Sequence, residues 1–277
     1  MGKRARLTII GAGNIGCAMA AGLAQAGRFQ SSEIILTRRT VANLAEMGSQ
    51  GFQTQADNRD AVRRAQTVIV AVQPGQLDQV LGEIGPELDA GRHLLISVVS
   101  GVGLDDLRRQ VGTDVPLARA MPNTGIALGR SMTCVAVSSD SEELREQVVS
   151  IFDSVGRTLV IDEELMVPAT ALGACGIAFF LRAIRAAAQG GIEIGFHPEE
   201  ALTMAAQTAL GAASLVLDRA RHPEREIDNV TTPRGCTISG LNEMEHHGFS
   251  SAMIRGITTS AEKARSLYSR STDRTGE

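Results

Sequence analysis

The sequence predicts an α/β fold in which a doubly wound parallel sheet comes first and an all-helical domain follows. Over about the first 160 residues, short apolar runs alternate with stretches of helical composition, which is the order expected of βαβ units. From about Pro168 onward Ala, Gly and Leu dominate, and runs of β-branched residues almost disappear. We therefore expect two domains, residues 1–162 and residues 163–277, with the boundary near Asp162.

The strands of the first domain are predicted from apolar runs of strand length. The run at 67–72 (Thr-Val-Ile-Val-Ala-Val) is the strongest, because it is apolar almost throughout, as is typical of a parallel strand buried on both faces. The other predicted strands are residues 7–10, 33–37, 94–99 and 133–137. Residues 15–26 and 41–47 have helical composition and are the predicted helices between the first strands.

The second domain is predicted from helix start and stop signals. A long helical segment begins at Pro168 and is interrupted by Gly190 and Gly191. Pro198, followed by two acids, starts a helix that we expect to reach about residue 219. We expect residues 221–228 to be a polar loop, residues 240–248 and 250–269 to be the last helices, and residues 271–277 to be a disordered tail.

Composition limits the classes of partner and the compartment. The net charge is −4 with no long basic run, so nucleic acid is not an expected partner. The four cysteines are far apart without ligand spacing, which argues against a metal site and suits a reducing cytoplasm. No signal peptide is expected. Arg182 and Arg185 interrupt the longest apolar stretch, at 169–188, so we interpret it as a buried helix and not as a membrane span.

The first chemical motif is a glycine-rich turn between the first predicted strand and the first predicted helix. Gly11 permits the tight turn, Gly13 lets the backbone approach a pyrophosphate, and Gly16 lets helix and strand pack closely. The helix then begins at Asn14 and Ile15, whose free N–H groups suit an anion. This context predicts a Rossmann-type domain that binds a dinucleotide through these five residues.

The end of the second strand predicts which dinucleotide is bound. An NAD site usually has an acid there, but this sequence has Arg38 and Arg39, which suit a 2′-phosphate. The predicted cofactor is therefore NADP as NADPH, with NAD as a second choice; the alternative is a solvated basic turn. A second predicted contact follows the third strand: Ala71, Val72, Gln73 and Pro74. There the alternative is that Pro74 only starts a helix.

Side chains for acid–base chemistry are hard to place in this sequence. The five histidines lie in turn or polar helical contexts that predict surface roles, and no nucleophile motif is present. Hydride transfer to a C=N bond fits, because the cofactor carries that chemistry. In the polar loop at 228–242, the N–H groups of Gly235 and Cys236 and the hydroxyls of Thr232 and Thr237 form a predicted carboxylate site. Composition alone favours the alternative, an ordinary helix cap by one of the threonines.

Several motifs together resemble the pyrroline-5-carboxylate reductase family. They are residues 230–237 (Val-Thr-Thr-Pro-Arg-Gly-Cys-Thr), 119–124 (Arg-Ala-Met-Pro-Asn-Thr), 199–202 (Glu-Glu-Ala-Leu) and 207–211 (Gln-Thr-Ala-Leu-Gly). The resemblance implies reduction of 1-pyrroline-5-carboxylate to proline by NADPH or NADH. It implies that Thr237 is the catalytic residue and forms a hydrogen bond with the ring nitrogen of the substrate. It also implies that Thr232, Gly235 and Cys236 hold the substrate carboxylate. It also places Met121 and Asn123 at the nicotinamide and Asn58 near the adenosine ribose or phosphate. A helical dimerisation domain that interlocks with a second subunit is implied, in dimers or decamers of dimers.

The sequence departs from the family pattern at four positions: Gly125, Cys175, Ile177 and Arg234. These departures keep two alternatives open, namely a reductase of another cyclic imino acid on the same scaffold and an NADP-binding sensor without turnover. A reductase of hydroxy acids is disfavoured. Such enzymes use a Lys or His proton donor in the helical domain, and residues 170–217 contain no Lys and only His197.

Overall fold

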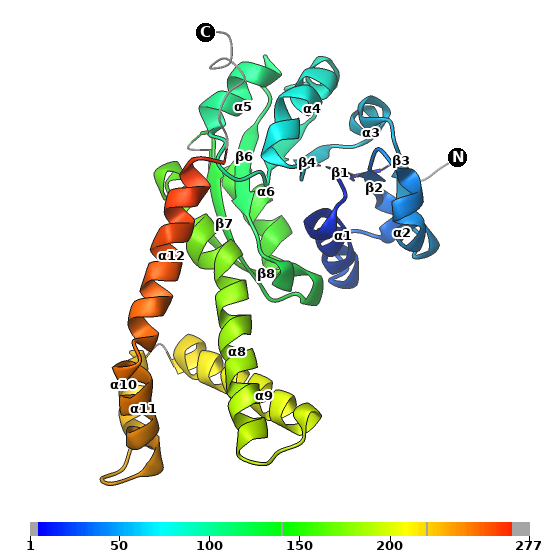
Figure 1. Cartoon of the computed structure of the whole chain (residues 1–277). Coiled ribbons are helices and arrows are strands. Elements are labelled where there is room, and N and C mark those ends of the chain that lie inside the picture. Colours follow the sequence, from blue (N-terminus) through cyan, green and yellow to red (C-terminus); the bar gives the residue numbers. More distant parts are fainter. Residues whose placement is uncertain (1–4, 113, 140, 220, 268–277) are drawn as a thin grey trace, which may run out of the picture. The chain divides into compact units, whose positions relative to one another are not determined.

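The computed structural model describes residues 5–112, 114–139, 141–219 and 221–267. Contacts divide the chain into two compact units, residues 1–175 with 260–277 and residues 176–259. The chain therefore enters the second unit once and returns to the first, as the colours of Figure 1 allow the reader to follow. The predicted domain boundary at Asp162 stays a prediction; the compact units exchange at residues 175/176 and 259/260.

The first unit contains an eight-stranded sheet in the order β3-β2-β1-β4-β5-β6-β7-β8. Every neighbouring pair is parallel except β6 and β7. The strands are β1 (Leu7–Ile10), β2 (Ile34–Thr37), β3 (Gln53–Gln55), β4 (Thr67–Val70), β5 (Leu94–Ser97), β6 (Leu117–Met121), β7 (Ser131–Val137) and β8 (Gly156–Val160). The chain runs outward from β1 to β3 and resumes at β4 beside β1, which confirms the doubly wound α/β fold and creates a switch point between β1 and β4.

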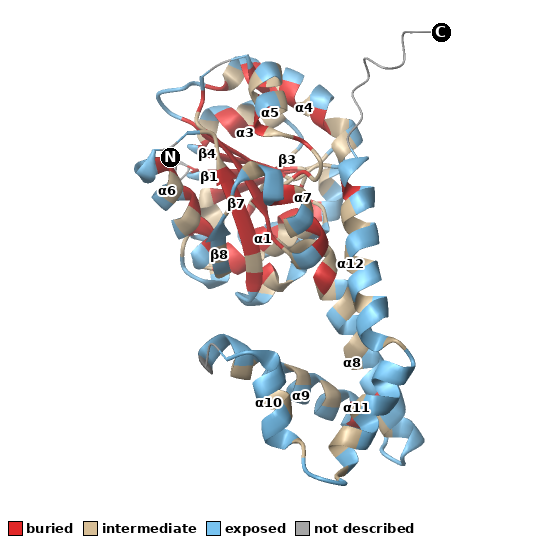
Figure 2. Cartoon of the chain, turned by 90° about the vertical axis from the view of Figure 1, so that its left-hand side faces the viewer, coloured by how far each residue is buried: buried red, intermediate tan, exposed pale blue. Residues whose placement is uncertain are grey.

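Two hydrophobic layers cover the two faces of this sheet. Alternate strand residues face opposite layers: Ile9 and Ile69 belong to one cluster, and Ile10 and Val70 to the other. Figure 2 shows the strands as the most deeply buried part of the unit. The helices of this unit are α1 (Asn14–Gln25), α2 (Ala45–Ser49), α3 (Asn58–Arg64), α4 (Leu77–Ile84), α5 (Leu104–Val111), α6 (Glu142–Asp153) and α7 (Met166–Ala169).

All five predicted strands are present, but three strands were missed. The β3 strand has only three residues, all polar, at the sheet edge, and β8 is at the opposite edge. The β6 strand is interrupted in its apolar pattern by Arg119, although all five of its residues are buried. Strand formation here depends on pairing with neighbours more than on the local sequence.

The second unit is built of helices. The π-helix Thr170–Cys175 of the first unit leads into α8 (Gly176–Glu193), and α9 (Pro198–Arg219), α10 (Pro223–Val230), α11 (Cys236–His246) and α12 (Phe249–Arg265) follow. The last residues of α12, from 260 onward, belong to the first unit. The helices α8 and α9 pack against each other at Gly191 and Ala201. A Cβ added at Gly191 would lie 3.0 Å from the Cβ of Ala201, so glycine permits this close approach. Gly190 and Gly191 therefore lie inside α8, and the prediction that they interrupt it is wrong.

The predicted loop at 221–228 is also wrong, because most of it belongs to α10. Pro223 occupies the first turn of α10, and the His222 side chain caps it by accepting a hydrogen bond from the N–H of Glu224 at 3.3 Å. Helix α9 begins in the same way, with a proline in its first turn. The polar composition of residues 221–228 nevertheless led to the prediction of a loop. The predicted tail at 271–277 lies outside the described residues.

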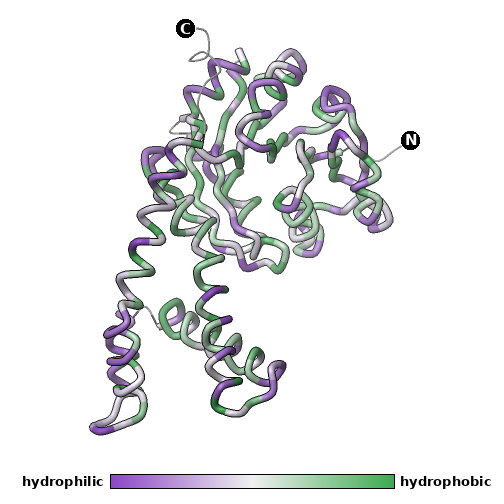
Figure 3. The backbone as a smooth tube through the Cα atoms, in the orientation of Figure 1, coloured by the Kyte–Doolittle hydropathy of each residue, from purple (hydrophilic) through white to green (hydrophobic). Residues whose placement is uncertain are grey.

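The helical unit leaves much apolar surface uncovered within one chain. Phe180 is 61% exposed, Leu181 59% and Leu210 57%. Figure 3 shows hydrophobic colour along much of α8 and α9. The prediction that the 169–188 stretch is a buried helix is therefore wrong for a single chain. By length and composition alone, Glu163–Glu193 and Pro198–Asp218 are each apolar enough to cross a membrane; that this region does not do so stays a prediction.

Candidate functional site

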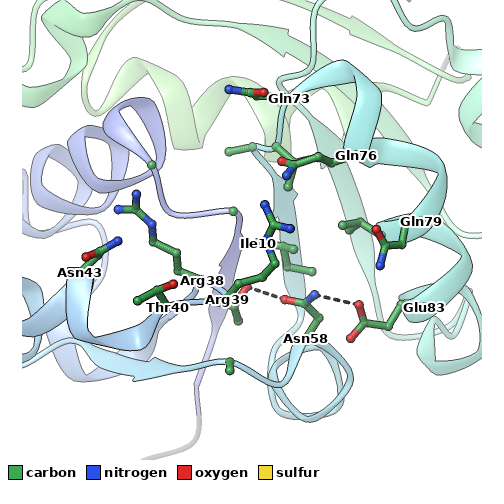
Figure 4. Close-up of a pocket in the computed structure, with 17 residues that line it drawn as sticks. Ile10, Arg38, Arg39, Thr40, Asn43, Asn58, Gln73, Gln76, Gln79 and Glu83 are labelled. Carbon is green, nitrogen blue, oxygen red and sulfur yellow. Dashed lines mark hydrogen bonds between the residues drawn. The ribbon is translucent and has the colours of Figure 1, made fainter.

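A cleft of about 510 Å³ lies at the carboxyl ends of β1, β2 and β4, beside the switch point of the sheet. Open α/β sheets bind ligands at this position. Figure 4 shows the side chains that enter it from the loop after β2, from α3 and from α4. The lining residues are Ile10, Gly11, Gly13, Thr37, Arg38, Arg39, Thr40, Asn43, Ala56, Asn58, Ala71, Val72, Gln73, Gln76, Gln79, Val80 and Glu83.

The glycine turn forms one wall of the cleft, and its geometry explains two of its glycines. Gly11 has a φ of +84°, and a Cβ there would lie 2.4 Å from Cγ1 of Val72. A Cβ at Gly16 would lie 3.2 Å from the carbonyl oxygen of Gly11 and 3.3 Å from Cγ2 of Ile9, so this glycine allows α1 to approach β1.

The amino end of α1 has no protein cap. Gly13 is the N-cap residue, and no side chain hydrogen bonds there. The first intrahelical bond runs from the N–H of Cys17 to the carbonyl of Gly13 at 2.9 Å. The N–H groups of Asn14, Ile15 and Gly16 therefore have no intrahelical partner and carry the positive end of the helix dipole. This end of the cleft is built to attract an anion.

The two predicted arginines follow β2 and reach into the same cleft (Figure 4). Among the described residues, neither Arg38 nor Arg39 forms an ion pair. Arg39 and Thr40 are exposed and Arg38 is half-buried. Two unpaired guanidinium groups beside an uncapped helix end make a site for an anion with more than one charged group.

The structure adds an acid to the cleft that sequence reasoning missed. The Thr37 hydroxyl donates to Oδ1 of Asn58 at 2.6 Å, and Nδ2 of Asn58 donates to Oε2 of Glu83 at 3.0 Å. Glu83 comes from α4, far in sequence from the glycine turn and from Arg38 and Arg39. The only sequence signal is helical spacing, because Gln76, Gln79 and Glu83 lie on one face of the helical turns that follow Gln73.

Of the four cofactor contacts predicted after β4, three line the cleft and one begins a helix. Ala71, Val72 and Gln73 line the cleft, whereas Pro74 opens a short 3₁₀ helix, Pro74–Gln76, that leads into α4. Asn58 also lines the cleft, and its contact with the adenosine ribose or phosphate stays a prediction.

The two predicted nicotinamide contacts are not among the lining residues of this cleft. Met121 is 4% exposed and packs in the core. The Asn123 side chain accepts from the N–H of Gly125 at 3.0 Å and donates to the carbonyl of Gly173 at 3.2 Å. Met121 is the last residue of β6 and Asn123 follows that strand, and their contact with a cofactor stays a prediction.

The predicted substrate loop lies in the helical unit, at the start of α11. The N-cap residue of α11 is Gly235, with no side-chain cap, so neither Thr232 nor Thr237 caps the helix and that alternative is wrong. The N–H of Gly235 donates to the carbonyl of Thr232 at 2.9 Å. It is therefore not free for a carboxylate, as the sequence had suggested, and the first free N–H groups are those of Cys236 and Thr237. Thr237 is half-buried, and Thr232 is exposed.

The residue before this helix has an unusual backbone conformation. Arg234 has a φ of 60°, and it is the only residue other than glycine with a positive φ among those that the structure describes. Side chains are disfavoured in this region, where glycine costs nothing. Arg234 therefore holds a backbone conformation that a glycine would adopt without cost.

An ion pair joins β6 to the segment that follows β8. Nη1 of Arg119 lies 3.1 Å from Oε1 of Glu163, and the Arg119 side chain is 5% exposed. The same oxygen accepts the N–H of Leu104, at the start of α5. Burial lowers the pKa of the Arg119 guanidinium, and the hydrogen bond and charge of Glu163 oppose that shift.

No histidine of the described chain is placed for proton transfer in the cleft. His93 corrects a prediction, because it is not on the surface: it is 4% exposed. Its Nδ1 accepts from the N–H of Asp89 at 2.9 Å, and Nε2 lies 3.2 Å from the carbonyl of Val62. Burial lowers the pKa of His93. Among the described residues, no group of three or more His, Cys, Asp or Glu side chains could hold a metal ion.

Known protein families, relatives and solved structures match most of this chain. Residues 163–267 match a family described as pyrroline-5-carboxylate reductase dimerisation, and residues 6–101 match one described as NADP oxidoreductase, coenzyme F420-dependent. Two Dictyostelium discoideum proteins, pyrroline-5-carboxylate reductases 1 and 2, are 50% and 45% identical over 95% and 93% of this chain. The chain spans half the length of the first and 91% of the second. A Plasmodium falciparum pyrroline carboxylate reductase structure with NADP bound is 25% identical, with a TM-score of 0.87, covering 97% of this chain and all of that one.

Proposed function

The chain belongs to the pyrroline-5-carboxylate reductase family, and we propose that it reduces 1-pyrroline-5-carboxylate to L-proline, the last step of proline biosynthesis. The observation that carries this proposal is the 45% identity across 91% of a reductase of that name, joined to a cleft built for a dinucleotide. The enzyme is an oxidoreductase that acts on a C=N bond. The alternatives, a different imine reductase and a non-catalytic sensor, are not favoured.

The cofactor is NADP(H), and the residues of the cleft fit it. The uncapped end of α1 suits the pyrophosphate, and Arg38 and Arg39 suit the 2′-phosphate. When bound, the cofactor supplies the hydride. The chain's own residues bind and orient it: Gly11 and Gly13 let the backbone come close, and Val72 packs against the glycine turn.

We assign substrate binding to the loop before α11. Thr232, Gly235 and Cys236 surround the carboxylate, and the N–H groups at the start of α11 supply donors. The Thr237 hydroxyl forms a hydrogen bond with the ring nitrogen, and Thr237 is the residue that we assign to catalysis. Because Gly235 already uses its N–H within the loop, its role is to keep space: a Cβ there would lie 2.5 Å from Oγ1 of Thr232.

The protein forms homo-oligomers through its dimerisation domain. We propose that the basic assembly is a homodimer, with a decamer of dimers as the larger form that the family resemblance implies. The exposed apolar residues of α8 and α9 support this, since an obligate interface resembles a hydrophobic core divided in two. A cytoplasmic location is also proposed, because the free thiols suit a reducing compartment.

The proposed activity is tested by steady-state oxidation of NADPH with 1-pyrroline-5-carboxylate, in parallel with other cyclic imines. We expect turnover with pyrroline-5-carboxylate at the highest kcat/KM of the set. A higher kcat/KM with another imine would assign the enzyme to that substrate, and cofactor binding without turnover of any imine would support a sensor.

The role of Thr237 is tested by replacing it with Ala and with Ser. Loss of one hydrogen bond to a charged group costs about 1.5–3 kcal/mol, so Thr237→Ala should lower kcat/KM by roughly tenfold or more. The Thr237→Ser variant keeps the hydroxyl and should retain most activity. Equal losses in the two variants, or none in Thr237→Ala, would remove the role.

A further inference from the structure

The cofactor cleft contains an acid where the second strand offers none, and we propose that Glu83 sets the balance between NADPH and NADH. In dinucleotide sites, an acid at the end of the second strand accepts hydrogen bonds from the ribose hydroxyls of NAD. This chain has arginines there, but α4 brings Glu83 to the same cleft from its opposite wall. The inference rests on the proposed function.

A hydrogen-bond chain holds Glu83 in this place. The hydroxyl of Thr37, the last residue of β2, donates to Oδ1 of Asn58 at 2.6 Å. Nδ2 of Asn58 then donates to Oε2 of Glu83 at 3.0 Å. If the amide were reversed, an oxygen would face a carboxylate, so the charge on Glu83 fixes the orientation of Asn58. The backbone of Glu83 is held as well, because Nε of Arg59 donates to its carbonyl at 3.1 Å.

One oxygen of this carboxylate remains available to a ligand. Oε2 accepts from Asn58, and within the described chain no hydrogen bond to Oε1 is formed. Glu83 is half-buried and lines the cleft, and no arginine of the described residues lies within ion-pair distance of it. A carboxylate accepts about four hydrogen bonds, so Oε1, on a side chain that lines the cleft, is an acceptor without a hydrogen-bond partner among the described residues.

The two walls of the cleft therefore act on the ribose in opposite directions. Arg38 and Arg39 attract the 2′-phosphate of NADPH, while Glu83 repels it. The ribose diol of NADH carries no charge and offers hydroxyl donors, which a carboxylate accepts strongly. Glu83 thus weakens the preference for NADPH that the arginines create, and it keeps NADH as a usable cofactor.

The test replaces Glu83 with Gln, which keeps the size of the side chain and an oxygen to accept from Asn58. We expect the ratio of kcat/KM with NADPH to kcat/KM with NADH to rise roughly 5- to 20-fold. Direct binding, measured by nucleotide fluorescence without substrate, should show a weaker NADH complex and an unchanged or tighter NADPH complex. Glu83→Asp keeps the charge and should shift the ratio less than Glu83→Gln does.

Glu87→Gln is the matched control. It removes the same charge one helical turn later, outside the cleft, where Glu87 pairs with Arg63 at 3.3 Å. The inference would be overturned if the NADPH-to-NADH ratio of kcat/KM shifted equally in the Glu83→Gln and Glu87→Gln variants. It would also be overturned if this ratio stayed unchanged or fell in Glu83→Gln. The binding arm separates this failure from failure of the proposed function, because it needs no imine: an inactive wild-type enzyme would still report both nucleotide affinities.

Discussion

The ion pair between Arg119 and Glu163 is expected to be the most sensitive electrostatic contact for stability. Its guanidinium is almost fully buried, at 5% exposure of the side chain, while the Glu163 side chain is 36% exposed. Replacing Glu163 with Gln leaves a buried charge without its ion-pair partner and weakens the acceptor for the N–H of Leu104. Two further nitrogens of Arg119, Nε and Nη2, have no hydrogen-bond partner within the described chain, so among the described groups only the charge of Asp106 compensates in part.

The magnitude follows from burial. Breaking a fully buried pair costs about 3–5 kcal/mol, and an exposed pair contributes about 0–1 kcal/mol. Because one partner is buried and the other is partly open to water, we expect Glu163→Gln to lower the free energy of unfolding by about 2–3 kcal/mol. Urea denaturation at a fixed protomer concentration measures this, since assembly also contributes to stability.

Two comparisons make the prediction specific. Glu164→Gln removes the same charge at the exposed neighbouring position and should cost less than about 0.5 kcal/mol. The double variant Arg119→Met with Glu163→Leu removes both charges and should be more stable than Glu163→Leu alone, because no buried charge is left behind. A Glu163→Gln cost below about 0.5 kcal/mol, or additive costs in the double variant, would refute the reasoning.

Three further predictions concern the cofactor, the backbone and pH. Replacing Arg38 and Arg39 together with Ala should raise KM for NADPH at least tenfold more than KM for NADH, and equal effects would show that they do not contact the 2′-phosphate. Arg234→Val should lower the free energy of unfolding in urea by about 1–2 kcal/mol while Arg234→Gly does not, since only the former worsens the strain at a φ of 60°; equal stabilities would contradict this. Burial holds the pKa of His93 below its ordinary value of 6.5, so below pH 6.5 the unfolded chain takes up a proton that the folded chain does not. The free energy of unfolding should therefore keep its full value above pH 6.5 and decrease as the pH falls below 6.5. His93→Asn should reduce this decrease, and an unchanged dependence of the free energy of unfolding on pH would remove His93 as its cause.

The fold was predictable where a signal is local. Apolar runs identified the strands β1, β2, β4, β5 and β7, and the glycine turn identified the start of α1, because the chemistry of each lies within a few residues. The edge strand β3 is polar, and α10 is disguised by polar residues, so local composition misled there. Their formation depends on the neighbours that pair or pack with them.

The residues of the site were also predictable only where the sequence carries a local signal. Arg38 and Arg39 were found because they follow a strand directly, and the structure places both in the cleft. Glu83 was missed because its position depends on Asn58, 25 residues earlier, through a side-chain hydrogen bond. The N–H of Gly235 was assigned to a ligand because sequence cannot show that the carbonyl of Thr232 already accepts it.

The return of the chain to the first unit has a consequence for its synthesis. The last strand of the sheet, β8, ends at Val160, so every strand that the structure describes is synthesised before the helices α8 to α12. The sheet needs no later residue for its pairing, whereas Ala264 on α12 is buried at 4% and belongs to the same unit. We expect the nucleotide cleft to form on the nascent chain before α12 is made, and α12 to join the first unit afterwards.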